Sequence, residues 1–196
     1  MFHNIPRAMK DRMTYLEGMD ARDRGDKTPH LERLRQIPPE TGRFLALMAA
    51  GAPAGAYLEI GTSAGYSALW IVLALQGRGI KLKTFEVLPQ KLALARETFH
   101  LSNVEDSVVL IEGDAREYLG QYQKTAFCFL DAEKDVYEDC CDSVIPNLVP
   151  GGILLADNLI SHADVMQPFL SRVTADPRVD SLVVPIGKGV LVCRKI

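Results

Sequence analysis

The stretch LEIGTSAGYS, Leu58 to Ser67, carries the strongest indication of the fold. A short apolar run ends there at two glycines, and a run of helical period begins directly after them. Glycine permits a tight strand-to-helix turn, and the N-terminus of the following helix favours a carboxylate or phosphate. The glycine spacing, Gly61 to Gly65, is GxxxG, which is neither the GxGxxG dinucleotide fingerprint nor a P-loop. Alone, the stretch is equally consistent with a plain turn and with a ligand site.

On both sides of this turn, short apolar runs alternate with segments of helical period. The runs are YLEI, KLKTFE, VVLIE, TAFCFLD and GILLAD, and the predicted helices run to Gln76, from Pro89, around Tyr118, over Tyr137 to Ile145 and from about Ala163 to Thr174. Repeated strand–helix units build a parallel sheet covered by helices on both faces, so we expect an α/β, doubly wound fold. The last two runs, SLVVPI and VLVCRK, are separated only by Gly187, Lys188 and Gly189, which predicts a hairpin and an antiparallel final strand.

Two helices are predicted before the first strand. Residues 7 to 35 show helical period, with Met9, Met13 and Leu16 on one face, until Pro38 and Pro39 interrupt the pattern. A second helix should run from Pro39 to Gly51, with proline inside its start and glycine just past its end. We expect residues 1–35 to form an N-terminal helical extension and residues 36–196 to form the main domain.

Composition and charge narrow the class of protein. A chain of 196 residues with 47% hydrophobic and 24% charged residues fits one globular domain. Its net charge of −3 counts against general binding of nucleic acid. No segment reaches the ~18 apolar residues of a membrane span, the start lacks a signal-peptide core, and the four cysteines form no CxxC pair, so we expect a soluble, cytoplasmic protein with buried, reduced thiols.

Acidic residues follow the second and third predicted strands. Glu86 ends the second strand, where an acid in a doubly wound fold accepts hydrogen bonds from ribose hydroxyls. Asp114 ends the third strand in EGDA, where its neighbours could flank an adenine. Glu86 could instead be a solvated carboxylate at the end of its strand. Together with the glycine turn, however, they predict a site for a nucleoside-like ligand at the carboxyl edge of the sheet.

Oxygen-bearing side chains also follow the next two strands. Asp131 ends the fourth strand, and Asp157 with Asn158 ends the fifth. These strand ends should be neighbours, and hard cations such as Mg²⁺ prefer carboxylate and amide oxygens. Turn capping would explain Asp157 and Asn158 taken alone. In combination with the predicted site for a nucleoside-like ligand, the pattern favours a metal site. Ligand type alone allows Mg²⁺, Mn²⁺ or Ca²⁺ at such a site.

Six ordered blocks resemble one known family. LEIGTSAGYSALW, FEVLPQKLALA, EGDA, FLDAEK, VPGGILLADN and VVPIGKGVLVCRK are similar to blocks of the cation-dependent O-methyltransferases of the catechol and caffeoyl-CoA type. The resemblance covers about residues 36–196 and rests on several blocks in order, not on one glycine motif.

The resemblance implies a seven-stranded, Rossmann-like fold that binds S-adenosylmethionine. It places Gly61 against this cofactor, Ser67 near its methionyl carboxylate, Glu86 on its ribose, Asp114 and Ala115 beside its adenine, and the backbone of Ile37 at its methionyl end. Further implied cofactor contacts are Glu59, Ser63, Val87, Asp131 and Tyr137. The resemblance also makes Asp131, Asp157 and Asn158 the ligands of a divalent cation, most simply Mg²⁺, assigns catalysis to Lys134 together with Asp131, and puts Tyr137 near the substrate.

Methyl transfer accounts for these residue types. An in-line displacement requires an acceptor oxygen that is deprotonated and held against the methyl group. A cation on that oxygen lowers its pKa, and Lys134 could take the proton if burial and the metal lower its own pKa. The alternative for Lys134 is a surface lysine paired with Glu133 or Asp135. His162 could be a second base or a substrate contact, although a loop histidine is the simpler interpretation.

Two departures from the family concern the acceptor side. LISHADVMQPF, after Asn158, is shorter than in many relatives, so the acceptor pocket could be open or completed by another subunit. Cys140 and Cys141 stand where many relatives carry tyrosines, and we interpret them as helix-packing thiols.

The leading hypothesis is a metal-assisted O-methyltransferase that acts on a small catechol-like acceptor, as a homodimer joined through the N-terminal helices. A hydroxylated tRNA nucleoside is an alternative acceptor. A dinucleotide-binding oxidoreductase and a non-catalytic S-adenosylmethionine-binding protein are alternatives of other classes. The missing third glycine disfavours the oxidoreductase, and the intact Asp131, Lys134, Asp157 and Asn158 disfavour the non-catalytic protein.

Overall fold

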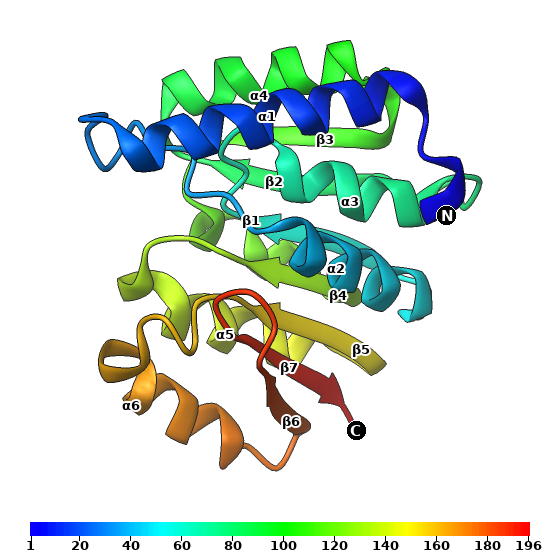
Figure 1. The fold of residues 1–196 in the computed structure, drawn as a ribbon. Helices are drawn as coiled ribbons and strands as arrows, with labels where there is room; N and C mark the ends of the chain where they lie inside the picture. The colour runs from blue at the N-terminus through cyan, green and yellow to red at the C-terminus, as the bar shows by residue number, and fades with distance from the viewer.

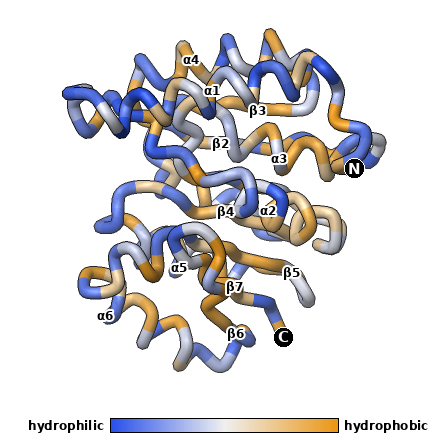
Figure 2. The backbone as a smooth tube through the Cα atoms, in the orientation of Figure 1, coloured by the Kyte–Doolittle hydropathy of each residue, from blue (hydrophilic) through white to orange (hydrophobic).

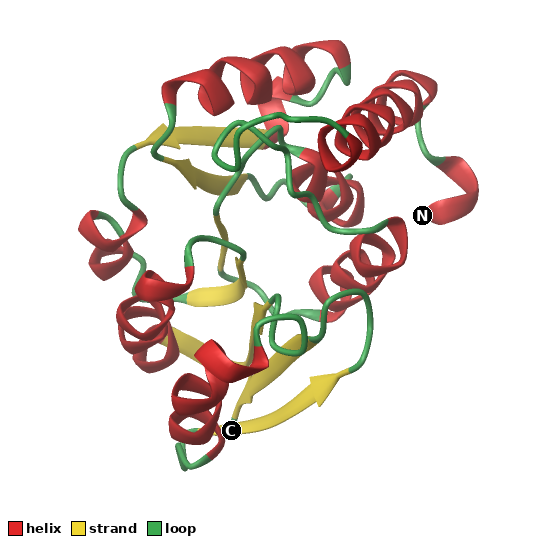
Figure 3. Cartoon of the chain, turned by 60° about the vertical axis from the view of Figure 1, so that its left-hand side comes forward, coloured by secondary structure: helices red, strands yellow, loops and turns green.

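The computed structural model describes residues 1–196 and contains one seven-stranded sheet between two groups of helices (Figures 1 and 3). The strands are β1 Ala56–Ile60, β2 Leu82–Glu86, β3 Val108–Glu112, β4 Thr125–Leu130, β5 Leu148–Ala156, β6 Val179–Val184 and β7 Val190–Lys195. The α-helices are α1 Arg7–Gly25, α2 Pro39–Gly51, α3 Tyr66–Leu75, α4 Pro89–Leu101, α5 Tyr137–Val144 and α6 Ala163–Thr174. Six 3₁₀ turns complete the chain, at Phe2–Asn4, Glu105–Ser107, Ala115–Glu117, Leu119–Gln121, Lys134–Val136 and Ile145–Asn147.

The strand order is β3-β2-β1-β4-β5-β7-β6, with β1 to β5 parallel and β7 antiparallel to both β5 and β6. The expected doubly wound, mostly parallel sheet and the closing hairpin are therefore confirmed. From β1 the chain adds strands first toward β3 and then, after β4, toward β6. Open α/β sheets bind ligands at such a switch point, outside the carboxyl ends of the strands.

Two cores pack on the two faces of the sheet. Alternate residues of the strands point to opposite faces, so Phe127 joins the core beneath α1 to α4, while Cys128 joins the core beneath α5 and α6. Every residue of β4 is buried, as its apolar run predicted, and Phe127 stacks on Tyr57 of β1 with ring centroids 5.7 Å apart. Figure 2 shows the hydrophobic residues concentrated in the inner strands and α3.

Helix α1 ends at Gly25, so the prediction of helix as far as residue 35 was wrong. Acidic side chains redirect the chain after the helix. Asp26 Oδ1 accepts a hydrogen bond from the Thr28 backbone N–H at 2.8 Å, and Asp23 Oδ2 accepts one from the Leu34 N–H at 3.0 Å. These bonds favour a loop because they replace intrahelical partners of the backbone. Residues 26–38, called the covering segment below, therefore connect α1 and α2 without a helix.

The predicted helix over residues 39–51 is confirmed, and all four cysteines are buried. Burial raises the pKa of the Cys140 thiol to about 12, which makes this thiol a packing group in α5.

No helix combines the length and the apolar character that crossing a membrane requires.

Helix α1 is anchored in the same core as the sheet-covering helices. Its Leu16 is completely buried, so we expect Leu16→Ala to lower the free energy of unfolding by about 2–5 kcal/mol. Urea unfolding followed by circular dichroism measures this loss, and Lys10→Ala, at an exposed position of the same helix, is the control. A loss below about 0.5 kcal/mol would mean that α1 contributes little to the stability of the domain.

Candidate functional site

Backbone hydrogen bonds hold the strand ends that carry the predicted site residues together at the carboxyl edge of the sheet. Backbone hydrogen bonds continue past the strands: Gly61 N–H donates to Phe85 O at 3.1 Å, Asp131 N–H to Ile60 O at 2.9 Å, and Asp157 N–H to Leu130 O at 3.1 Å. The residues that follow β1, β4 and β5 are consequently fixed side by side by the sheet itself.

Gly61 brings two of these strand ends into contact. Its φ is +96°, and a Cβ atom at this position would lie 2.1 Å from the backbone oxygen of Asp131. Only glycine fits because the turn after β1 lies directly against the end of β4. The glycine turn therefore joins the two halves of the site.

A cleft of about 730 Å³ opens along this edge. It is lined by most of the residues predicted from the sequence: Ile37, Gly61, Ser63, Ser67, Glu86, Val87, Asp114, Ala115, Asp131, Lys134 and Asn158. Three predicted residues, Glu59, Tyr137 and Asp157, are fully buried behind its wall instead. The cleft is large enough for a nucleoside-containing ligand together with a small second molecule.

Glu86 is held rigidly at the end of β2. Its Oε2 accepts a hydrogen bond from Ser63 N–H at 2.8 Å, and its Oε1 accepts from Val87 and Leu88 N–H groups at 2.9 Å each. A carboxylate oxygen has more than one lone pair, so the group can still accept bonds from a ligand. Its placement suits the recognition of ribose hydroxyls.

Asp114, at the end of β3, is engaged by Arg116. Both carboxylate oxygens accept from the guanidinium, the shortest contact being 2.6 Å from Nη2. These hydrogen bonds lower the pKa of Asp114. Arg116 also donates to Asp139 of α5 at 3.0 Å, so a charged network lies at this end of the cleft.

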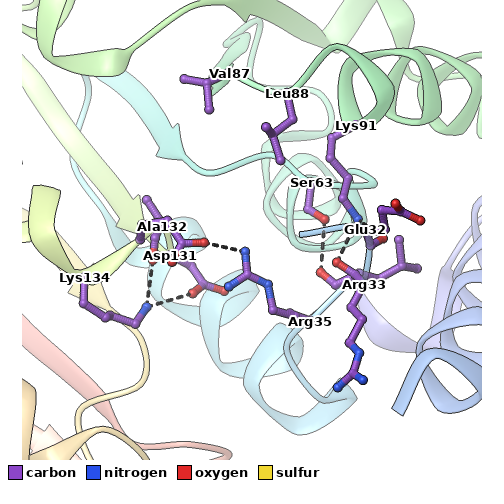
Figure 4. Close-up of polar contacts among 12 residues, drawn as sticks. Glu32, Arg33, Arg35, Ser63, Val87, Leu88, Lys91, Asp131, Ala132 and Lys134 are labelled. Carbon is purple, nitrogen blue, oxygen red and sulfur yellow. Dashed lines mark hydrogen bonds and ion pairs between the residues drawn. The ribbon is translucent and has the colours of Figure 1, made fainter. Parts of the chain in front are cut away.

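Seven residues of the covering segment line the cleft, and Figure 4 shows Glu32, Arg33 and Arg35 of this segment between Lys91 and Lys134. On one side, Lys91 Nζ donates to Glu32 O at 2.7 Å and to Arg33 O at 2.8 Å. On the other side, Arg35 pairs with Glu133 at 2.6 Å, in the loop that follows Asp131. The covering segment thus links the start of α4 to the loop after β4.

The three predicted metal ligands meet at the ends of β4 and β5. Asn158 Nδ2 donates to Asp131 Oδ1 at 2.7 Å, and both carboxylate oxygens of Asp157 are buried without a hydrogen-bond partner. Burial, and then the charge of Asp131, raises the pKa of Asp157 to about 7. The structure contains no cluster of three or more His, Cys, Asp or Glu side chains that could hold a metal ion. The predicted set differs from such a cluster because its third member, Asn158, is an amide.

Lys134 lies next to this set and does not pair with Glu133 or Asp135. Its Nζ donates to Ala132 O at 2.8 Å and to Tyr137 Oη at 2.7 Å, and lies 3.7 Å from Asp131 Oδ1. Burial lowers the pKa of Lys134, while the neighbouring carboxylates oppose this effect. Tyr137 lies behind Lys134 and orients its amine.

Glu59 is a second buried carboxyl, inside β1. Its Oε2 accepts a hydrogen bond from Thr84 Oγ1 at 2.6 Å, and its Oε1 has no partner. Burial raises the pKa of Glu59 from its ordinary value of 4.5 to about 7. This group supports the floor of the cleft and does not line it.

Six lysine and arginine residues that line the cleft were absent from the predicted site: Arg24, Arg33, Arg35, Lys91, Arg116 and Lys188. Arg35 and Lys91 contact partners far along the chain, which no local pattern indicates. Lys188 had a usable signal, because a final strand antiparallel to β5 must begin at the edge where β5 ends.

Comparison with known proteins identifies the family. Residues 15–196 match the family model described as O-methyltransferase. A catechol O-methyltransferase of Niastella koreensis is 31% identical over 66% of this chain, which spans 61% of that relative's length. Caffeoyl-CoA O-methyltransferase 1 of Eucalyptus globulus is 26% identical over 80% of this chain and 73% of its own.

A solved structure has the same fold. The SAH-bound methyltransferase PaMTH1 of Podospora anserina superimposes with a TM-score of 0.78 at 25% identity, over 98% of this chain and 89% of its own. The chain therefore belongs to the family of S-adenosylmethionine-dependent O-methyltransferases that includes the catechol and caffeoyl-CoA enzymes, which confirms the resemblance and excludes the oxidoreductase alternative.

The buried carboxyl of Glu59 predicts a pH dependence of stability. Because its pKa is raised on folding, the folded protein retains a proton that the unfolded chain releases. The free energy of unfolding should therefore fall as pH rises from about 4.5 to about 7, and Glu59→Gln should remove up to about 3 kcal/mol of that fall.

Urea titrations at several pH values, compared between the two proteins, isolate this contribution. Glu117→Gln, at an exposed position, is the control. An unchanged pH dependence in Glu59→Gln would show that Glu59 titrates normally.

Proposed function

We propose that the chain is a divalent-metal-assisted O-methyltransferase that uses S-adenosylmethionine and acts on a small acceptor with vicinal oxygens, such as a catechol. The observation that carries the proposal is the fully buried Asp157, whose two oxygens lack partners beside Asp131 and Asn158. A buried carboxylate without a partner is costly, and a cation offsets that cost. The names of the catechol and caffeoyl-CoA relatives support the acceptor class.

The donor set fits a hard cation. Asp131, Asp157 and Asn158 supply oxygen atoms only, as Mg²⁺ prefers, and the cleft beside them leaves room for further oxygen ligands. A cation bound there would lower the pKa of the acceptor hydroxyl and polarise it toward its oxyanion. The Glu86 end of the cleft, with the glycine turn, suits the nucleoside part of the methyl donor.

The chain's own residues complete the reaction. Lys134, in its neutral form, accepts the proton from the acceptor hydroxyl. The acceptor oxygen then attacks the methyl carbon, the bond between that carbon and the sulfonium breaks, and its electron pair stays on sulfur, leaving S-adenosylhomocysteine and an ether. Tyr137 holds Lys134 by the 2.7 Å contact. The homodimer expected from the N-terminal helices stays a prediction.

Metal dependence is the first test. Methyl transfer to catechols, flavonoids and hydroxylated tRNA nucleosides, measured after chelation with EDTA and again with added Mg²⁺, should show activity on catechols that EDTA abolishes and Mg²⁺ restores. Asp157→Asn should lower kcat/KM by at least about 100-fold while raising the melting temperature of the metal-free protein, since it removes a buried charge.

Asp106→Asn, at an exposed position outside the cleft, is the matched control and should match the wild type. Full activity in Asp157→Asn, or activity that thorough chelation does not change, is incompatible with the metal mechanism. Activity on tRNA nucleosides alone would replace the acceptor class.

Lys134 is tested by two substitutions. Lys134→Met should lower kcat by about 10²- to 10⁴-fold because the proton acceptor is lost. Lys134→Arg keeps the charge but cannot deprotonate near neutral pH, so it should not restore the rate. Single-turnover methylation measures both. Equal rates for Lys134→Arg and the wild type would assign Lys134 an electrostatic role instead.

A further inference from the structure

The turn Gly187–Lys188–Gly189 brings a basic residue to the acceptor side of the cleft. Strand β7 is antiparallel to β5, with Leu191 opposite Ala156, so the residues just before β7 lie beside those just after β5. Figure 1 shows the red connection between β6 and β7 next to the segment that follows β5. Lys188 consequently lines the same cleft as Asn158 and Lys134.

The backbone of this turn is firmly held. Lys188 O accepts hydrogen bonds from Ile160 N–H at 3.0 Å and Ser161 N–H at 3.1 Å, and Gly189 O accepts from Leu159 N–H at 3.0 Å. Gly189 has a φ of +88°, and a Cβ atom there would lie 2.4 Å from the Ile160 side chain. The short segment after Asn158 is thus joined to the turn, and together they form a fixed wall of the cleft.

Lys188 differs from the other basic side chains of the cleft in having no partner. Arg24, Arg35, Arg116 and Lys134 each lie within 4.0 Å of a carboxylate, while Arg33 and Lys91 donate to backbone carbonyls. The Lys188 amine makes no hydrogen bond and has no carboxylate within that distance, although its residue is partly buried. A positive charge is therefore held on a rigid wall with its donors free for a ligand.

Lys188 lies beside the end of β5, on the side of the cleft that carries Asn158 and Lys134. Burial lowers the pKa of His162. The positive charges of Lys134, Lys188 and Arg35 lower it further. The nucleoside end of the cleft, around Glu86 and Asp114, lies on the other strands of the edge.

We propose that Lys188 determines specificity for acceptors that carry a carboxylate in addition to their vicinal oxygens, that is, for acidic catechols. The inference rests on the proposed function and narrows its substrate class. Lysine suits this task because its ammonium is a compact charge on a flexible stem, which pairs with a carboxylate without demanding one orientation. The expected gain is moderate because the amine remains partly solvated.

A matched pair of acceptors tests the proposal. The carboxylate of 3,4-dihydroxybenzoate is replaced in 3,4-dihydroxybenzamide by a neutral group of similar size, and the readout is the ratio of kcat/KM for acid over amide. In the wild type the acid should be favoured, and Lys188→Met should lower the ratio about tenfold. Lys188→Arg should largely restore the ratio, and Lys188→Glu should invert the preference by like-charge repulsion.

Lys81→Met, an exposed lysine outside the cleft, is the control and should leave the ratio unchanged. If both acceptors are methylated and the ratio is the same in wild type and Lys188→Met, the role of Lys188 is refuted and the proposed function stands. If neither catechol is methylated, or only tRNA is, both proposals are overturned. Thermal melting confirms that each variant is folded, and a folded Lys188→Glu without the inversion also counts against the inference.

Discussion

The parallel pairing of β1, β4 and β5 is the constraint on which the rest of the site depends. The ladder continues for one residue beyond the strands, through the bonds from Asp131 N–H to Ile60 O and from Asp157 N–H to Leu130 O. Those bonds fix the two carboxyl groups side by side, and they hold the end of β4 so close to the first turn that only glycine fits at residue 61. The two cores above and below the sheet keep this pairing rigid. The positions of Gly61, of Lys134 and of the set Asp131, Asp157 and Asn158 all follow from this pairing.

The same edge concentrates polar groups that oppose folding. Glu59 and Asp157 are completely buried with unpartnered oxygens, and burial raises the pKa of each to about 7. A core of apolar side chains around β4 provides the free energy that tolerates them. Neither carboxylate oxygen of Asp157 has a hydrogen-bond partner, and the charge of Asp131 adds to the effect of burial on its pKa. Glu59 connects the first and second strands, because its Oε2 accepts a hydrogen bond from Thr84 of β2.

Much of the fold and part of the site could be predicted from the sequence, for reasons that individual residues illustrate. The buried run from Thr125 to Leu130 and the acid after it are local signals, so β4 and Asp131 could be placed without a structure. The end of α1 could not, because it depends on Asp23 bonding the backbone of residue 34. Nor could the sequence separate residues that line the cleft from Glu59 and Tyr137, which lie behind it, since that distinction depends on packing from several elements.

The turn between β6 and β7 separates two tasks within three residues. The backbone carbonyls of Lys188 and Gly189 accept hydrogen bonds from the segment after β5, and Gly189 packs closely against Ile160. The Lys188 side chain takes part in neither contact. A substitution at residue 188 therefore changes the chemistry of the cleft wall while the pairing of the segment after β5 is retained. Such a position can vary during evolution at little risk to the fold. Relatives that share the sheet and the residues at the ends of β4 and β5 could therefore differ in the molecules they modify through this one side chain.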